Sequence, residues 1–319
     1  MAQHNFTPTH YHTAIGTHES VLSLADGDTV STTTVDAGGH DASGEQVTEG
    51  GNPQTGPFYI QGAEPGDSIS ITFDHLMPNR DNGYTSSKVA ANVLDPGHRT
   101  GFDNDRVVWG IDFDAHTATP IELRSRDATP NVRSISPDSP LGKLTLPLNP
   151  HPGCFGVAPP RGQAISTSTS STHGGNMDYK RFNQGVTVHF PVFVEGALFH
   201  VGDGHALQGD GEIVGTGIEI SFNITFTAHL HKGKTIRWPR AENDTHILTV
   251  GNARPLDQCV QHATSEMIRW LTTDFGLDEQ TAHVLLGEAV EYDMGNMFDP
   301  AYTMVCKVSK DILKQLGVM

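Results

Sequence analysis

The chain has 319 residues and a net charge of −17, with 20 Lys and Arg against 37 Asp and Glu. Proteins that bind nucleic acid or anionic membranes neutralise phosphates with clustered Lys and Arg, so this charge argues against both classes of partner. The three cysteines are widely spaced and form no CxxC pair, which excludes a disulfide framework and a cysteine-rich zinc module.

No apolar run approaches the roughly 18 residues of a membrane span. The first residues, MAQHNFTPTH, have neither the basic nor the apolar region of a signal peptide. We therefore expect a cytoplasmic protein with one large domain or two.

The N-terminal half alternates short strand patterns with turn sequences. Residues 21–35 show the first pattern, with ADGD as its turn, and residues 69–73 show another after the turn EPGD. Residues 78–106 are rich in Asn, Gly and Asp, which predicts a long surface excursion. Residues 107–113 then return as a strand.

One loop in this half displays an acid and an imidazole together. Asp36, His40 and Asp41 surround two glycines in TVDAGGHD. This pattern fits either an ordinary hairpin turn or part of a polar site.

A second loop carries a cysteine. Prolines are dense over residues 127–160, which argues against helix there. Within this segment, NPHPGCFGVAPP at residues 149–160 contains Cys154. This residue is either a nucleophile, with His151 as the only nearby imidazole, or a small packed residue.

Most of the chemistry lies in residues 173–219, where acids and histidines alternate with glycines. Residues 188–194 and 218–227 bracket a connection and have the alternation of half-buried strands. That connection, residues 200–212, is longer than a hairpin needs. Its glycines permit positive φ, so carboxylates and imidazole can converge on one point. The alternatives are plain turn formers, or a loop that binds structural calcium through oxygens.

The last quarter of the chain has helical spacing instead. Apolar residues recur every three to four positions after Pro255, through residue 271, and again over residues 278–290. Ser309 is the expected cap of a final helix that ends near Leu316.

We therefore expect an α+β, mainly β, fold with β-sandwich or barrel-like sheets and a helical C-terminal portion. Residues 1–240 would form the catalytic core and residues 241–319 a helical portion packed on it, unless both form one integrated domain. Four loops of the core would form the site, at residues 36–41, 149–160, 173–182 and 200–212.

Several motifs occur in order between residues 56 and 227: GPFYIQGAEPGD, NPHPGCFGVAP, HGGNMDYKRF, FPVFVEGALFHVGDGHALQGDGE and GTGIEIS. Together they resemble the acetamidase/formamidase family of amide hydrolases. The resemblance implies hydrolysis of a short aliphatic amide, such as formamide or acetamide, to the carboxylate and ammonia. It also implies a mostly β core with an added α/β portion and a soluble homo-oligomer, a dimer or larger. The implied cofactor is a divalent metal, zinc first, with calcium as a possible structural ion.

The chemistry of amides explains why such residues are needed. An amide resists hydrolysis because its carbonyl is resonance-stabilised and its nitrogen is a poor leaving group. A metal held by Asp and His can activate water and polarise the carbonyl, and a carboxylate can carry the proton. The family's motif residues are intact here: Asn176, Asp178, Asp203, His205, Gln208, Asp210 and Glu212.

We predict that Asp203 and His205 are metal ligands, and that Asp178 or Asp36 completes the shell.

Glu212 is the predicted general acid/base, a role that Asp210 can exchange with it. Asn176 or a loop N–H is the predicted oxyanion donor, and Asp178 is a further catalytic candidate. The predicted substrate contacts are His173, Gly175 and Gln208.

Two other functions remain open at this stage. One is a non-catalytic, metal-stabilised protein that binds small polar ligands. The other is a hydrolase of another linear C–N substrate, such as a larger amide.

Overall fold

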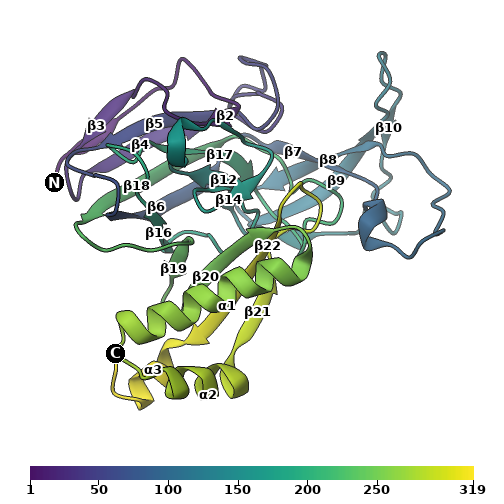
Figure 1. The fold of residues 1–319 in the computed structure, drawn as a ribbon. Coiled ribbons are helices and arrows are strands. Elements are labelled where there is room, and N and C mark those ends of the chain that lie inside the picture. Colours follow the sequence, from purple (N-terminus) through teal and green to yellow (C-terminus); the bar gives the residue numbers. More distant parts are fainter.

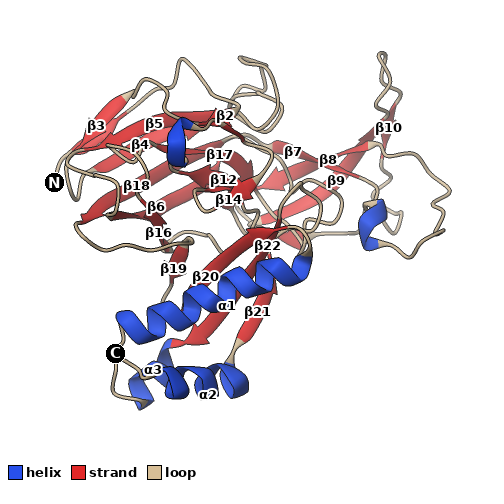
Figure 2. Cartoon of the chain, in the orientation of Figure 1, coloured by secondary structure: helices blue, strands red, loops and turns tan.

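The computed structural model describes residues 1–319 as facing β-sheets with the longer helices gathered at one end (Figure 1). Colouring by secondary structure shows that strands make up the larger part of the molecule (Figure 2). The larger sheet has nine strands, in the order β1 (Gln3–Asn5), β4 (Thr29–Thr34), β18 (Phe222–His231), β6 (Ser68–Pro78), β16 (Thr187–Pro191), β19 (Arg240–Glu242), β20 (His246–Ala253), β22 (Tyr302–Ser309) and β21 (Glu291–Met294).

Three smaller sheets complete the strand structure. The six-stranded sheet has the order β14 (Ser170–Ser171), β15 (Gly174–Asn176), β12 (His151–Gly156), β17 (Phe199–His205), β5 (Gln54–Ile60) and β3 (Leu22–Leu24). The five-stranded sheet contains β10 (Val132–Ser134), β9 (Thr117–Arg124), β8 (Arg106–Asp112), β7 (Asn82–Ser86) and β11 (Leu146–Pro147), which pairs with β9. The last sheet pairs β13 (Ile165–Ser166) with β2 (Ala14–Ile15).

Aromatic side chains fill the space between the nine-stranded and six-stranded sheets. Phe226 of β18 packs edge-to-face on Phe58 of β5 and Phe199 of β17, with ring centroids 5.1 and 5.2 Å apart. Phe155 of β12 contacts Phe73 of β6 in the same way. The apolar face predicted for the strand at 218–227 therefore points into a sandwich core, which confirms the mainly β fold.

The three helices predicted near the C-terminus are confirmed. Asp278 and Ser309 cap the second and third helices, because their side chains accept backbone N–H groups of the first turn. None of the helices is long and apolar enough to cross a membrane. The helices are α1 (Leu256–Thr273), α2 (Glu279–Ala289) and α3 (Lys310–Gln315), with short 3₁₀ turns η1 (Ala91–Val93) and η2 (Pro160–Gly162) elsewhere.

Helix α1 packs on β20 and β22 and forms a second apolar core with α2. Glu266 of α1 is buried and accepts a hydrogen bond of 2.8 Å from the guanidinium of Arg240 in β19. A charge buried to this degree is tolerated because it is paired. The expected boundary at residues 240–241 falls within β19, which pairs with β20, so the two expected portions share one sheet.

The expected loop over residues 200–212 is wrong in its first half. Residues 200–205 belong to β17, a buried strand of the six-stranded sheet. The bracketing strands β16 and β18 do not pair with each other, because β6 lies between them. The chain therefore leaves one sheet after β16, forms a strand in the facing sheet, and returns as β18.

Three other expectations need correction. The excursion at 78–106 contains β7, which pairs with β8, and the loop at 149–160 contains β12. The strand expected to begin at Ile218 begins at Phe222 instead. Before it, the main chain of residues 218–220 bonds to Gly204 of β17 and to the two residues that follow β17, which brings Glu219 against His205.

Candidate active site

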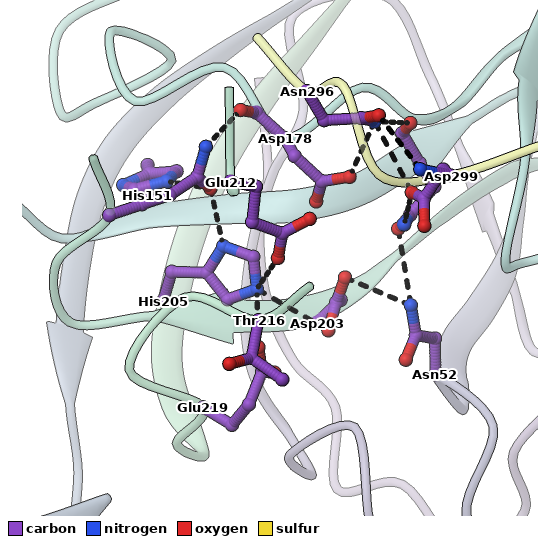
Figure 3. A network of polar contacts seen from close by, with 12 residues as sticks. Asn52, His151, Asp178, Asp203, His205, Glu212, Thr216, Glu219, Asn296 and Asp299 are labelled. Carbon is purple, nitrogen blue, oxygen red and sulfur yellow. Dashed lines mark hydrogen bonds and ion pairs between the residues drawn. The ribbon is translucent and has the colours of Figure 1, made fainter. Parts of the chain in front are cut away.

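Buried polar side chains meet where β12, β15 and β17 approach the loop before β18 (Figure 3). Strand β17 supplies Asp203 and His205, and Asp178 follows β15 by two residues. Glu212 and Glu219 come from the segment between β17 and β18. All five side chains are buried.

His205 lies at the centre of the cluster. Its Nε2 is 3.0 Å from Glu219 Oε1, 3.6 Å from Asp203 Oδ1 and 3.9 Å from Glu212 Oε1. Two groups of residues could hold a metal ion and both include His205, one with Asp203 and Glu219 and the other with Asp178 and Glu212.

Gln208 fixes the tautomer of His205. The Gln208 amide nitrogen donates to the backbone carbonyls of Asp178 and Gly295, which turns its oxygen toward His205. His205 Nδ1 lies 2.9 Å from that oxygen and therefore donates to it. The lone pair of Nε2 then faces the carboxylates, the arrangement found in metal-bound histidines. Gln208, predicted as a substrate contact, therefore orients the His205 ring.

Three oxygen atoms and one nitrogen atom in the cluster have no hydrogen-bond partner. They are Asp178 Oδ1, Asp203 Oδ1, His205 Nε2 and Glu219 Oε2. Buried polar atoms are nearly always satisfied, because an unmade hydrogen bond costs about 1–3 kcal/mol. No Lys or Arg forms an ion pair with these side chains. Carboxylate oxygens and one imidazole nitrogen that face a shared space fit a divalent metal, zinc among them.

Several carboxyl groups in the cluster have raised pKa values, because the groups are buried and no Lys or Arg pairs with them. Burial raises the pKa of Asp178 and Glu212 well above the usual carboxyl range, and raises the pKa of Glu219 to about 8. Burial lowers the pKa of His205, but Glu219 and Asp203 outweigh it and raise that pKa well above 6.5. A bound cation would favour the ionised carboxylates.

The backbone is strained at three of these positions. Asp178, Asp203 and Glu212 have positive φ angles of 46°, 56° and 46°. Non-glycine residues adopt this region at a cost, and such residues gather at functional sites.

Asparagine side chains donate hydrogen bonds to the carboxylates. Asn52 donates to Asp203 Oδ2 over 3.1 Å, and Asn296 donates to Asp178 Oδ2 over 3.0 Å. Asn176 donates through its amide nitrogen to Asp299, at 2.5 Å. One of the two N–H groups of this amide therefore has Asp299 as its partner, and the role of Asn176 as oxyanion donor stays a prediction.

A glycine makes room for the cluster. A Cβ at Gly153 in β12 would lie 2.5 Å from Asp178 Oδ1, 2.7 Å from His205 Cε1 and 2.8 Å from Asp203 Oδ2. This crowding explains the glycine in the motif NPHPGCFGVAP.

The structure does not bring Asp36 to the cluster as a ligand. Its Oδ2 accepts a hydrogen bond of 2.5 Å from Arg80, and its Oδ1 accepts the N–H groups of Gly38 and His40. Both oxygens therefore have partners already.

Three other predicted residues also lie apart. Asp210 is exposed and pairs with Lys180 at 2.9 Å, which removes it as the exchange partner of Glu212. His173 is buried with both ring nitrogens unpartnered, and Gly175, two residues later, pairs within the six-stranded sheet. Neither belongs to the two groups of residues that could hold a metal ion.

Several residues of the site were not predicted: Asn52, His151, Glu219, Asn296 and Asp299. Glu219 stands in the quoted motif GTGIEIS, but its place in an alternating pattern indicated a solvent-facing side chain. His151 packs edge-on against His205, with ring centroids 5.3 Å apart, and burial lowers its pKa to about 4.

Cys154→Ser is expected to keep most of any hydrolytic activity. Cys154 is fully buried and burial raises the pKa of its thiol well above the usual range, so no thiolate is available as a nucleophile. We expect a loss of stability of about 1–3 kcal/mol from the buried hydroxyl, measured as melting temperature beside a steady-state assay. Cys306 of β22 is also buried, so Cys306→Ser is the matched control. Complete inactivation with intact fold and metal would establish thiol chemistry instead.

The model of the Acetamidase/Formamidase family matches residues 161–315. An acetamidase from Mycolicibacterium smegmatis is 29% identical over 236 residues, 56% of this chain and 53% of that protein, so the chain spans about half the length of this curated relative.

Similarity to solved structures extends further along the chain. A crystal structure of an acetamidase from Yersinia enterocolitica is 30% identical, with a TM-score of 0.79 over 98% of this chain and 93% of that one. An acetamidase from Bacillus halodurans is 26% identical, with a TM-score of 0.79 over 98% and 99% of the two chains.

Proposed function

Because the chain belongs to the acetamidase/formamidase family, we propose that it hydrolyses a short aliphatic amide, formamide or acetamide, to the carboxylate and ammonia. The observation that carries the proposal is the cluster of buried carboxylates around His205, whose unpartnered oxygens and nitrogen face one another without a Lys or Arg. A cluster of this kind is stable when a cation is bound, and amide hydrolysis uses such a cation.

We propose that Asp203, His205 and Glu219 hold the metal, zinc first. Their ligand atoms lie closest together, with Glu219 3.0 Å and Asp203 3.6 Å from His205 Nε2. When bound, zinc supplies a Lewis acid that lowers the pKa of water and polarises a carbonyl.

The protein then has to move protons and keep the ligands in place. Glu212 takes the proton from the attacking water and delivers it to the leaving nitrogen, because its carboxylate forms no hydrogen bond within the protein and is free to exchange protons. Gln208 keeps His205 in the required tautomer, and Asn52 fixes the orientation of Asp203. A cytoplasmic location and a homo-oligomer, dimer or larger, remain part of the proposal, and calcium remains the alternative as a structural ion.

Metal dependence is the direct test of this proposal. Purified protein is expected to contain close to one divalent ion per chain by elemental analysis, and to release ammonia from formamide or acetamide. Chelation should abolish ammonia release and added zinc should restore it, because polarisation of the carbonyl supplies several kcal/mol of transition-state stabilisation. A metal-free preparation with full activity would contradict the mechanism. Protein that contains metal but releases no ammonia from any amide would instead be a binding protein.

A further inference from the structure

A cavity of about 960 Å³ lies beside the carboxylate cluster. Gly51, Tyr84 and Phe298 are part of its lining. Each is next to the cluster: Gly51 precedes Asn52, Phe298 precedes Asp299, and the main chain of Tyr84 bonds to that of Glu219. The cavity is far larger than formamide or acetamide needs and has the volume of a pocket for a larger ligand.

Basic side chains gather in this cavity, although the chain as a whole is strongly acidic. Lys88, Arg99, Arg106 and Arg126 all line it. The only lining carboxylate is that of Asp95.

These cations are not neutralised by the protein. Lys88 donates to the backbone carbonyl of Phe102, and Arg126 donates to the hydroxyl of Ser86 and to a carbonyl. The guanidinium of Arg106 lies 4.0 Å from the centroid of the Tyr84 ring. None of the four basic side chains forms an ion pair with a carboxylate, whereas Arg80, Lys232 and Arg240 elsewhere in the chain do.

We propose that this cavity binds a carboxylate at the far end of the substrate, so that the substrate class is the monoamides of dicarboxylic acids. The inference rests on the proposed amide hydrolysis, since it assigns the part of the substrate that does not react. Arginine side chains bind carboxylates through paired N–H groups, and a cleft lined by one sign of charge concentrates ligands of the opposite sign. The acidic protein surface would otherwise repel such a substrate.

The test compares two amides of similar length and size. Succinamate carries a terminal carboxylate, and 4-methylpentanamide replaces that carboxylate with an isopropyl group. We expect kcat/KM for ammonia release to be roughly 10–100-fold higher for succinamate, the range given by charge-assisted hydrogen bonds. This ratio should fall as salt is added, because ions screen the attraction.

Arg126→Gln and Arg99→Gln should each lower the ratio of the two kcat/KM values by about tenfold. Arg161→Gln is the matched control, since Arg161 lies outside the cavity and also forms no ion pair. Equal hydrolysis of both amides, with a ratio unchanged in Arg126→Gln, would overturn the inference and leave the proposed function standing.

Titration calorimetry with succinate, the expected product, distinguishes failure of the anion site from failure of the proposed hydrolysis, because binding needs no turnover. If neither amide releases ammonia but succinate binds and Arg126→Gln weakens binding at least tenfold, the anion site is supported and the proposed activity fails. If succinate does not bind and neither amide is preferred, the inference is overturned.

Discussion

Glu219→Gln is expected to remove the bound metal and to lower kcat for amide hydrolysis roughly 10³-fold, because the lost Lewis acid supplies several kcal/mol. Glu219 Oε1 is 3.0 Å from His205 Nε2, and Oε2 has no partner in the protein. Glutamine keeps the size of the side chain but not its charge. The variant therefore tests the ligand and leaves the packing nearly unchanged.

The measurements are metal content by elemental analysis, kcat and melting temperature. Glu45→Gln is the matched control, because Glu45 is an exposed glutamate outside both groups that could hold the metal, so this variant should keep both metal and activity. Chelated wild type should match Glu219→Gln in both activity and melting temperature. If Glu219→Gln retains its metal and its turnover, the ligands are the other group, Asp178 and Glu212 with His205.

Periodicity predicted the elements better than their partners. The alternation that ends at Thr227 and the helical spacing after Pro255 both identified real elements, since β18 and α1 each have one buried face. Neither pattern says which strand pairs with which. The sequence therefore did not reveal that β6 separates β16 from β18, or that residues 200–205 lie in the facing sheet.

The candidate site was predicted in part for the same reason. Asp203 and His205 are two residues apart, so one short stretch of sequence displays both. Asn296 and Asp299 approach Asp178 from more than 100 residues further along the chain, and local spacing carries no information about such contacts. Only the resemblance to a family joined separate motifs into one site.

Asp36 and Asp210 show the opposite limitation. Both stand beside glycines in acid-rich loops, which made them candidates by residue type. Their partners Arg80 and Lys180 lie 44 and 30 positions away in the sequence, and these ion pairs decide the role of each aspartate. An acid is free to bind metal only when no cation nearby already pairs with it.

Glu212→Gln is expected to lower kcat by roughly 10²–10⁴-fold, the usual contribution of general acid–base catalysis. Its Oε1 lies 3.9 Å from His205 Nε2, further than the oxygens of Asp203 and Glu219. Glutamine preserves the shape of the side chain but cannot carry a proton. Metal content and melting temperature should therefore stay near wild type.

The pH dependence gives an independent measurement of the role of Glu212. Burial raises its pKa well above the usual carboxyl range. A base must be deprotonated to accept the proton of water, so wild-type kcat should fall as pH drops through this raised pKa. Glu212→Gln should lack that acidic limb. Loss of metal in the variant would make Glu212 a ligand, in the group with Asp178 and His205. Full turnover with metal retained would exclude both roles for Glu212.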